Sequence, residues 1–316
     1  MANILILTGP TGCGKTYSAF KHLNKKDKAI YMAPCRQLVY ESFIKYHKEG
    51  DSLLCSDIKI NGKGNNIFAT YESITPKNLK EADVLIIDEA HFLTDEERGP
   101  HLRSLIAYGE KMNKKMLLLT ATVTFKLKKA KVLHLQPKQK FNKEEVNYSS
   151  FKERMKAGVP TLVFCSRKDE CGDYARAYGL KGAVITADTP VVDRIRLINL
   201  FQQGKITLIE ATNAMAQGVN VSCENLFINY SSWDDDATVI QKYGRLGRMG
   251  ITQNNNLTYN YNYDDKLDIN KLYKNLEERT VKLSIKKHVA KKPHQEESRQ
   301  DLSKKEKQQL QKLLKI

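Results

Sequence analysis

The sequence predicts an α/β fold of two doubly wound, parallel-sheet domains followed by a short basic helical C-terminal tail. Short β-rich runs alternate with helical patterns almost to the end of the 316 residues, which is typical of doubly wound sheets. Most of these runs are continuously apolar, as expected for parallel strands that are buried on both faces.

The predicted strands fall into two sets. The first set is Ile4–Thr8, Ala29–Ala33, Ile67–Thr70, Val84–Asp88 and Met116–Thr120. The second set is Thr161–Cys165, Ala183–Thr186, Thr207–Ala211, Leu226–Asn229 and Leu257–Tyr263. Helical patterns lie between them, including Thr16–Leu23, Arg36–Lys45, Gly172–Ala177 and Asp193–Gln202. Two such sets predict two similar domains.

A polar stretch separates the two sets. Residues 136–145 read QPKQKFNKEE, with a proline and no apolar periodicity, which makes them the best linker candidate. We therefore expect the first domain over residues 1–140 and the second over residues 146–263. Beyond residue 263 the pattern becomes lysine-rich and helical, which predicts the basic tail over residues 264–316.

The chain is strongly basic, with a formal net charge of +16. Residues 282–316 hold eleven Lys and Arg against four Asp and Glu and so carry +7 of it. Such a balance indicates a polyanionic partner, of which nucleic acid is the commonest. A tail that serves only solubility is the alternative.

The cysteines and the apolar runs argue against several classes of protein. The six cysteines form no C-x-x-C pair, so a zinc site or a disulfide framework is not expected. No apolar run approaches the roughly 18 residues of a membrane span. The sequence therefore predicts a soluble, cytoplasmic protein without a membrane partner, and we expect it to act as a monomer.

Residues 9–16 read GPTGCGKT and fit the pattern G-x-x-x-x-G-K-[ST] between an apolar run and a helical pattern. Glycines let backbone N–H groups point at phosphate oxygens, Lys15 adds a cation, and the Thr16 hydroxyl can ligate Mg²⁺. A glycine-rich turn before a helix is the alternative. The expected nucleotide ligands are Gly9, Thr11, Gly12, Cys13, Gly14, Lys15 and Thr16.

Residues 84–91 read VLIIDEAH. The apolar run ends in Asp88 and Glu89, so these side chains emerge at the carboxyl edge of the sheet, where open α/β sheets bind ligands. We expect Asp88 to hold Mg²⁺ together with Thr16, and Glu89 to orient or deprotonate the attacking water. His91 is a further catalytic candidate, with a helix-capping or core role as the alternative.

Residues 241–250, QKYGRLGRMG, place Arg245 and Arg248 among glycines. Phosphoryl transfer spreads negative charge over the γ-phosphate oxygens, and a cation delivered from another domain can stabilise that charge. We interpret the two arginines as fingers that face an interdomain cleft. The alternative is a surface turn with two solvated charges.

The motifs together resemble one family. GPTGCGKT, APCRQL, TYESI, DEAH, TAT, FCSR, EATNAMAQGVN and QKYGRLGR occur in the order of the superfamily 2 helicases, so the chain resembles the DExH/DEAH members of that superfamily over about residues 1–262. GPTGCGKTYSA and DEAHFLTDEERG are similar to the mitochondrial RNA-degradosome helicases, and AMAQGVN is similar to the Ski2-like group. The resemblance implies two RecA-like domains that bind ATP and Mg²⁺ between them and a nucleic-acid strand across both.

The resemblance also implies residue roles. The contacts to backbone phosphates would come from Pro34, Arg36, Thr70, Ser166, Arg167 and Thr212. Thr120 and Thr122 would couple the nucleotide state to strand binding. Threonines also cap helices and fill turns, so a structural role is the alternative for each of them.

Three further residues of the second domain complete the implied site. Asn213 and Gly218 would contact the nucleotide, and Gln241 would join the two arginines at the γ-phosphate. Lys242 departs from the pattern, because the DEAH family usually has arginine there.

These expectations describe an ATP-dependent helicase or translocase. A nucleic-acid clamp or remodelling protein that NTP switches is the alternative, and a kinase with a small acceptor would leave the motifs of the second domain unexplained. The sequence does not distinguish DNA from RNA as the nucleic acid on which the protein would move. The residues themselves do not distinguish ATP from other NTPs. The resemblance implies movement in the 3′ to 5′ direction. The lysine- and asparagine-rich composition would suit a virus, whose host cytoplasm would then be the location.

Overall fold

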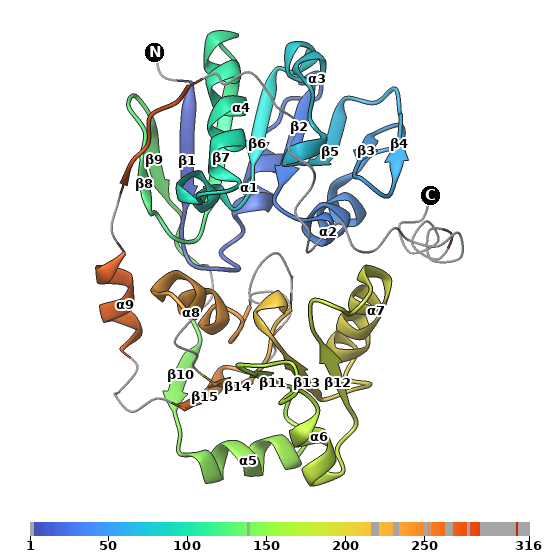
Figure 1. The fold of residues 1–316 in the computed structure, drawn as a ribbon, viewed down its shortest axis with the longest axis vertical. Helices are drawn as coiled ribbons and strands as arrows, with labels where there is room; N and C mark the ends of the chain where they lie inside the picture. Colours follow the sequence, from blue (N-terminus) through green and yellow to red (C-terminus); the bar gives the residue numbers. More distant parts are fainter. Residues whose placement is uncertain are drawn as a thin grey trace. The chain divides into compact units, whose positions relative to one another are not determined.

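The structure is a computed structural model that describes residues 3–137, 140–215, 221–229, 234–248, 252, 254–262, 268–276, 279–284 and 308. It divides into two compact units (Figure 1). The first comprises residues 3–9, 14–135 and 279–284, and the second comprises residues 10–13 and the described residues of 136–276.

The first unit is built on an eight-stranded sheet with the order β4-β3-β5-β2-β6-β7-β1-β9 among the described residues. Neighbouring strands pair parallel, except for β3 with β4. The strands are β1 (Ile4–Thr8), β2 (Ala29–Ala33), β3 (Ser52–Leu54), β4 (Lys59–Ile60), β5 (Asn66–Thr70), β6 (Val84–Ile87), β7 (Lys115–Thr120) and β9 (Lys131–His134). The helices are α1 (Lys15–Lys21), α2 (Arg36–Tyr46), η1 (Tyr71–Ser73), α3 (Pro76–Glu81), η2 (Ala90–Thr94) and α4 (Gly99–Lys111).

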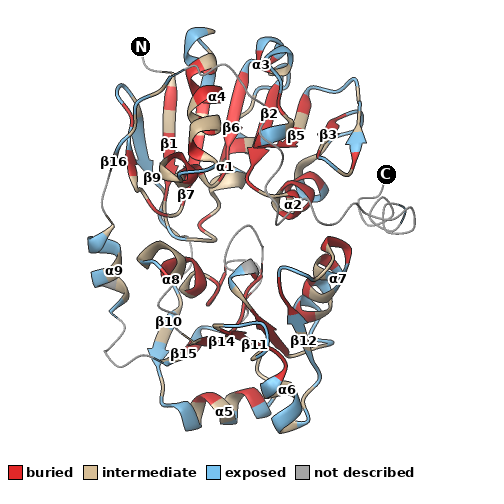
Figure 2. Cartoon of the chain, viewed as in Figure 1, coloured by how far each residue is buried: buried red, intermediate tan, exposed pale blue. Residues whose placement is uncertain are grey.

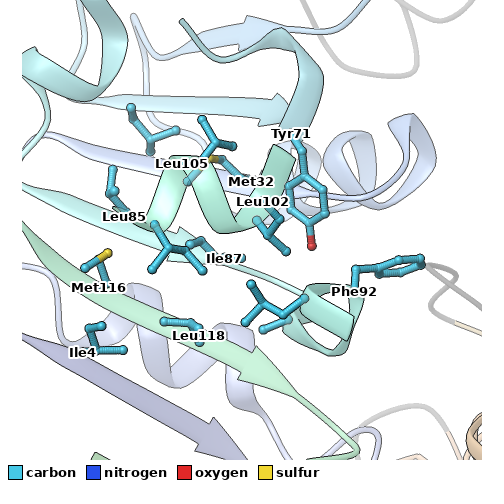
Figure 3. Packing of buried hydrophobic residues seen from close by; sticks show 14 of the residues in the cluster. Ile4, Met32, Tyr71, Leu85, Ile87, Phe92, Leu102, Leu105, Met116 and Leu118 are labelled. Carbon is cyan, nitrogen blue, oxygen red and sulfur yellow. The ribbon is translucent and has the colours of Figure 1, made fainter. Parts of the chain in front are cut away.

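Both faces of this sheet are covered, as a doubly wound fold requires. Ile30 and Met32 of β2 pack into the core that includes Leu102 and Leu105 of α4 (Figure 3). Tyr31, which lies between them, points to the opposite face, where its ring contacts Phe20 of α1. This alternation explains why β2 is apolar throughout its length and buried at all five residues (Figure 2).

The second unit carries a six-stranded, all-parallel sheet with the order β10-β15-β14-β11-β13-β12 in the described part of the chain. Its strands are β10 (Asn142–Glu145), β11 (Thr161–Phe164), β12 (Gly182–Ile185), β13 (Leu208–Ala211), β14 (Asn225–Asn229) and β15 (Asn256–Asn262). Its helices are α5 (Tyr148–Lys156), α6 (Asp173–Tyr178), α7 (Val191–Gln202), η3 (Asn213–Met215), α8 (Asp236–Tyr243) and α9 (Ile269–Asn275).

The central strand β11 shows how this sheet is also covered twice. Leu162 and Phe164 pack into a core with Ile198 of α7, whereas Val163 faces a separate core with Phe151 of α5. The two-domain α/β prediction is therefore confirmed. No helix in the described ranges combines the length and the apolar content needed to cross a membrane.

All ten predicted strands form, and their ends lie within one residue of the predicted ends, although Tyr263 lies outside the described residues. The four predicted helices also form, with ends that differ by up to two residues. The linker prediction needs a correction. Asn142–Glu145, expected to belong to the linker, forms β10 and pairs with β15 at the edge of the sheet, because backbone pairing does not require apolar side chains.

A short segment after α9, residues 279–284, belongs to the first unit, and we call it the returning segment. Its strand β16 (Arg279–Thr280) pairs parallel with β8 (Phe125–Lys126), and the Val281 N–H donates to the Lys126 carbonyl at 3.0 Å. The side chains of Val281 and Leu283 pack against the core of the first unit. The expected helical tail thus begins with a helix, α9, but continues as an extended segment.

Replacing both Val281 and Leu283 by aspartate should loosen β8. The double variant loses two half-buried apolar contacts, together worth roughly 1–3 kcal/mol, and introduces two charges against the core. Hydrogen exchange at the amides of residues 125–127 should accelerate. Ser284→Asp adds charge to an exposed position of the same segment and is the matched control. Equal exchange in both variants would contradict the contact.

Candidate nucleotide and nucleic-acid site

The phosphate cradle follows β1 and ends at the first turn of α1. Gly12 and Gly14 have φ values of 82° and 90°, a left-handed conformation that glycine adopts without a steric cost. The Lys15 ammonium donates to the Gly9 carbonyl at 2.7 Å, so it folds back over the loop. Within the loop, the Cys13 N–H donates to the Pro10 carbonyl at 3.2 Å. Successive left-handed turns of this kind direct backbone N–H groups toward an anion.

The Thr16 hydroxyl connects this loop to the carboxylate at the end of β6. It donates to Oδ2 of Asp88 at 3.1 Å. The Tyr31 hydroxyl also donates to Oδ2, at 2.8 Å, and the Glu89 N–H donates to Oδ1 at 2.9 Å. Burial, with a smaller contribution from the neighbouring Glu89 carboxylate, raises the pKa of Asp88 to about 6.

Glu89 has an unusual backbone. Its φ of 50° and ψ of 47° place it in the left-handed region, which is costly for a residue with a side chain and is often found at functional sites. The Tyr71 hydroxyl donates to the Asp88 carbonyl beside it and fixes the turn. The His91 Nδ1 lies 3.3 Å from Oε2 of Glu89. His91 therefore contacts the carboxylate that the sequence predicts as the general base.

The donor atoms of Thr16 and Asp88 fit a magnesium ion. Both are oxygens, which Mg²⁺ prefers, and they lie side by side at the end of the phosphate cradle. The described residues contain no group of three or more His, Cys, Asp and Glu side chains that could hold a metal ion. Proteins usually bind Mg²⁺ through one or two side chains and the phosphates of a substrate.

Thr120 and Thr122 form a compact turn at the end of β7. The Thr120 hydroxyl donates to the Thr122 carbonyl at 2.6 Å and accepts from the Thr122 N–H at 3.2 Å. Both residues are buried. The pair is therefore a rigid turn at the same edge of the sheet as Asp88, since β6 and β7 are parallel neighbours.

The three residues of the first unit expected to contact a strand are all engaged within the protein. The Pro34 carbonyl accepts from the Arg98 guanidinium at 3.0 Å, and the Thr70 hydroxyl lies 2.9 Å from that of Ser73. The Arg36 side chain is 8% exposed and pairs with Asp57 at 3.1 Å.

In the second unit, Ser166 and Arg167 lie in the loop after β11. Their N–H groups both donate to Oε2 of Glu170, at 3.0 and 3.3 Å. The Arg167 side chain is 77% exposed and so is accessible to a ligand. Thr212, at the end of β13, donates its N–H to the Ile185 carbonyl at 3.2 Å. These residues occupy the carboxyl edge of the second sheet.

A buried carboxylate that the sequence analysis missed binds the first turn of α6, the helix that follows this loop. Glu210 of β13 is fully buried and accepts the N–H groups of Gly172, Tyr174 and Ala175 at 2.8, 3.2 and 2.8 Å. It therefore satisfies the first turn of α6. The sequence feature that could have identified Glu210 is its position as an isolated acid within the apolar run of a predicted strand.

A second missed acid, Asp234, joins the predicted site residue Asn213 to Lys242, the residue that departs from the family pattern. Its carboxylate accepts from the Asn213 amide at 2.8 Å and from the Lys242 ammonium at 2.7 Å. Lys242 and Asp234 are 1% and 0% exposed, and burial lowers the pKa of the lysine. The departure at Lys242 was the signal, because a buried cation needs a buried acid. Gly218 lies outside the described residues.

The segment with the two arginines is held more firmly than its glycines suggested. The Arg245 carbonyl accepts the Cys223 N–H at 3.0 Å, and Leu246 forms a parallel bridge to Cys223. The Arg248 N–H donates to the Thr252 hydroxyl at 2.9 Å. Gly247 has a φ of 70°, and a Cβ there would lie 2.3 Å from Leu257. Gln241 precedes the segment on α8 and is buried.

Comparisons with known proteins agree with this arrangement. Residues 2–112 match the DEXQ-box helicase domain of Suv3, and residues 143–250 match the helicase conserved C-terminal domain. The chain belongs to the superfamily 2 helicases. The cradle and the 88–91 box lie in the first match, and Asn213, Gln241 and Arg248 lie in the second.

Individual relatives of this helicase share about a quarter of its residues. A predicted helicase of Sulfolobus islandicus filamentous virus (isolate Iceland/Hveragerdi) is 25% identical, with 77% of this chain and 47% of the viral protein covered. The ATP-dependent RNA helicase RhlB of Photorhabdus laumondii is 26% identical, with 76% and 69% covered. The chain thus spans about half the length of the viral relative.

Two solved structures share the fold of this helicase. S. cerevisiae Dbp5 bound to RNA and ADP BeF3 has a TM-score of 0.60 at 18% identity, over 88% of this chain and 85% of Dbp5. Mycobacterium smegmatis Lhr bound to ssDNA and AMP-PNP has a TM-score of 0.60 at 15% identity, over 82% and 43%. The fold is therefore the tandem RecA-like fold of these helicases.

This helicase has His91 at the fourth position of the box, where the name of the matching Suv3 domain has glutamine. The imidazole of His91 lies beside the Glu89 carboxylate, with Nδ1 at 3.3 Å from Oε2.

The buried Asp234–Lys242 ion pair should contribute more to the free energy of unfolding than an exposed ion pair does. Lys242→Met leaves a buried carboxylate with one donor fewer and should cost about 3–5 kcal/mol, whereas Lys242→Met combined with Asp234→Leu should recover part of the loss. Urea unfolding of the two single variants and the double variant measures the coupling. Lys168→Met, at an exposed ion pair with Asp188, is the control and should cost less than about 1 kcal/mol. Additive losses at residues 234 and 242 would contradict the pairing.

Proposed function

We propose that this helicase hydrolyses ATP in a reaction that single-stranded RNA stimulates, and that it uses the cycle to move along or unwind RNA. The observation that carries the proposal is the hydrogen bond between Thr16 and Asp88, which joins the phosphate cradle and the acidic box in one site. RNA is proposed before DNA because the RhlB relatives are RNA helicases.

The cradle and its neighbours would bind the nucleotide. The Lys15 ammonium, now on the Gly9 carbonyl, would exchange this carbonyl for β- and γ-phosphate oxygens. The glycine turns would present backbone N–H groups to the same phosphates. Thr16 and Asp88 would hold Mg²⁺, which, when bound, neutralises charge on the phosphates. Asn213 and Gly218 are proposed as further nucleotide contacts.

Glu89 would act on the attacking water. Its strained backbone and the Tyr71 hydroxyl hold the turn in one conformation, so the carboxylate is placed before substrate arrives. His91, whose Nδ1 lies 3.3 Å from Oε2 of Glu89, would position this carboxylate. Glu89 is thus the proposed general base and His91 a positioning residue.

The remaining site residues have proposed roles in charge stabilisation and strand binding. Gln241, Arg245 and Arg248 would face the γ-phosphate, where developing negative charge attracts cations. The rigid Thr120–Thr122 turn would couple nucleotide state to the strand. The strand contacts we propose are Pro34, Thr70, Ser166, Arg167 and Thr212. Arg36, which pairs with Asp57 at 3.1 Å, is proposed with them.

The first test is the steady-state ATPase rate of the full chain with single-stranded RNA, single-stranded DNA, or neither. We expect RNA to raise the rate by at least about tenfold, because strand binding completes the site. Glu89→Gln should bind ATP and RNA but hydrolyse slowly, and Glu96→Gln, an exposed neighbour, should behave as the parent chain. Stimulation by DNA alone would show that the nucleic-acid substrate is DNA and not RNA. A rate that no strand changes would leave a switched clamp as the better description.

Arg248→Ala should lower the turnover number by about 10³-fold and change the dissociation constant for ATP by only a few-fold, because a finger acts mainly in the transition state. Single-turnover hydrolysis and equilibrium nucleotide binding separate the two effects. Arg176→Ala, at an exposed arginine that pairs with Asp173, is the control. Full turnover in Arg248→Ala would remove the finger assignment.

A further inference from the structure

An exposed tyrosine follows the phosphate cradle directly. Tyr17 comes one residue after Thr16, on the first turn of α1, and is 51% exposed. This is the largest exposed fraction among the large hydrophobic side chains of the described residues. Its hydroxyl has no hydrogen-bond partner in the described part of the chain, so no polar contact explains the position of the ring.

Three aromatic rings stack on one another beside Tyr17 in the chain, and one of them, Phe20, also belongs to α1. Phe68 is buried on β5, and Phe20 stacks on it with centroids 5.5 Å apart and planes at 14°. Tyr46 of α2 stacks on Phe20 at 4.6 Å, again at 14°. Tyr17 precedes Phe20 by three residues, which places the two side chains on one face of α1. By this spacing, Tyr17 lies on the side of α1 from which Phe20 joins the aromatic stack.

A lysine ammonium lies over the ring of Tyr17, and another lies over the ring of Tyr46. The Lys21 ammonium is 5.9 Å from the centroid of the Tyr17 ring, and the Lys45 ammonium is 5.5 Å from that of Tyr46. A cation on one face of a ring leaves the other face for a planar, electron-poor partner. Nucleobases are such partners, and stacking on an aromatic side chain contributes about 1–3 kcal/mol per base.

We propose that Tyr17 is the stacking platform for the base of the nucleoside triphosphate held by the cradle. The inference rests on the proposed function, because it assumes that the cradle binds a nucleotide. Tyr17 lies one residue beyond the cradle, so its exposed ring is close in the chain to the phosphates that the cradle would bind.

Recognition by a ring face has a consequence for nucleotide choice. Every base has a π-face, so stacking discriminates weakly, whereas a site that hydrogen-bonds a base edge can reject the wrong base by about 10⁴-fold. The helicase should therefore bind ADP and GDP with dissociation constants within about threefold of each other, and UDP more weakly because its ring is smaller.

The test is calorimetric titration of the full chain with ADP, GDP and inorganic tripolyphosphate, each with Mg²⁺. In Tyr17→Ala the dissociation constants for ADP and GDP should rise about tenfold, and that for tripolyphosphate, which has no base, should stay unchanged. Tyr17→Phe should retain the parent affinities. Tyr148→Ala is the matched control, because Tyr148 is 42% exposed and has Lys152 over its ring in the same i, i+4 arrangement.

The outcomes separate the possible failures. If Lys15→Ala leaves tripolyphosphate and ADP affinity unchanged, the nucleotide site itself is wrong. If Lys15→Ala weakens both and Tyr17→Ala weakens neither, only the platform is wrong. Equal losses for ADP and tripolyphosphate in Tyr17→Ala would show that Tyr17 supports the cradle instead. A loss of single-stranded RNA affinity in nucleotide-free Tyr17→Ala, with ADP unaffected, would assign the ring to a base of the strand.

Discussion

The carboxylate of Asp88 is buried at the end of β6, and the candidate catalytic centre of the first unit is arranged around it. Burying a charge is unfavourable unless donors surround it, and here α1, β2 and the following residue each supply one. The Ser42 hydroxyl of α2 donates to Tyr31 and extends the network by one more element. Because the donors come from separate elements, the network can form only when the sheet and both helices are in place. The site is thus a consequence of the completed fold.

The second unit uses buried acids in a similar way. Glu210 holds the first turn of α6 behind the Ser166–Arg167 loop, and Asp234 joins η3 to α8. A carboxylate can accept about four hydrogen bonds, so one buried acid can satisfy several backbone or side-chain donors at a loop. In both units, loops at the carboxyl edges of parallel strands are held by acids of the sheet or of the adjoining turns. These hydrogen bonds connect the loops that carry candidate site residues to the sheet and its helices.

Among the described residues, six strands were missed from the sequence, and each has only two to four residues: β3, β4, β8, β9, β10 and β16. Of these, β9 and β10 are edge strands with mostly exposed side chains. Strands buried on both faces produce apolar runs, which is why strands such as β2, β6 and β11 could be placed to within a residue. An edge strand is stabilised mainly by pairing with a neighbour that is distant in sequence, such as Asn142 with Asn256. Nothing in the local pattern of residues 142–145 indicates that partner.

By itself, the sequence determined the chemistry that lies within contiguous residues. The glycines and Lys15 of the cradle, the acids that end β6 and the order of the motifs could all be read directly, because each depends on local backbone conformation and on the residues beside it. Only the tertiary structure decided which charges meet. Arg36 pairs with Asp57, Lys242 with Asp234, and His91 lies against Glu89, while Tyr17 remains exposed. Such pairings depend on how helices pack on the sheet, and the free energy of a buried charge depends on partners that local sequence does not specify.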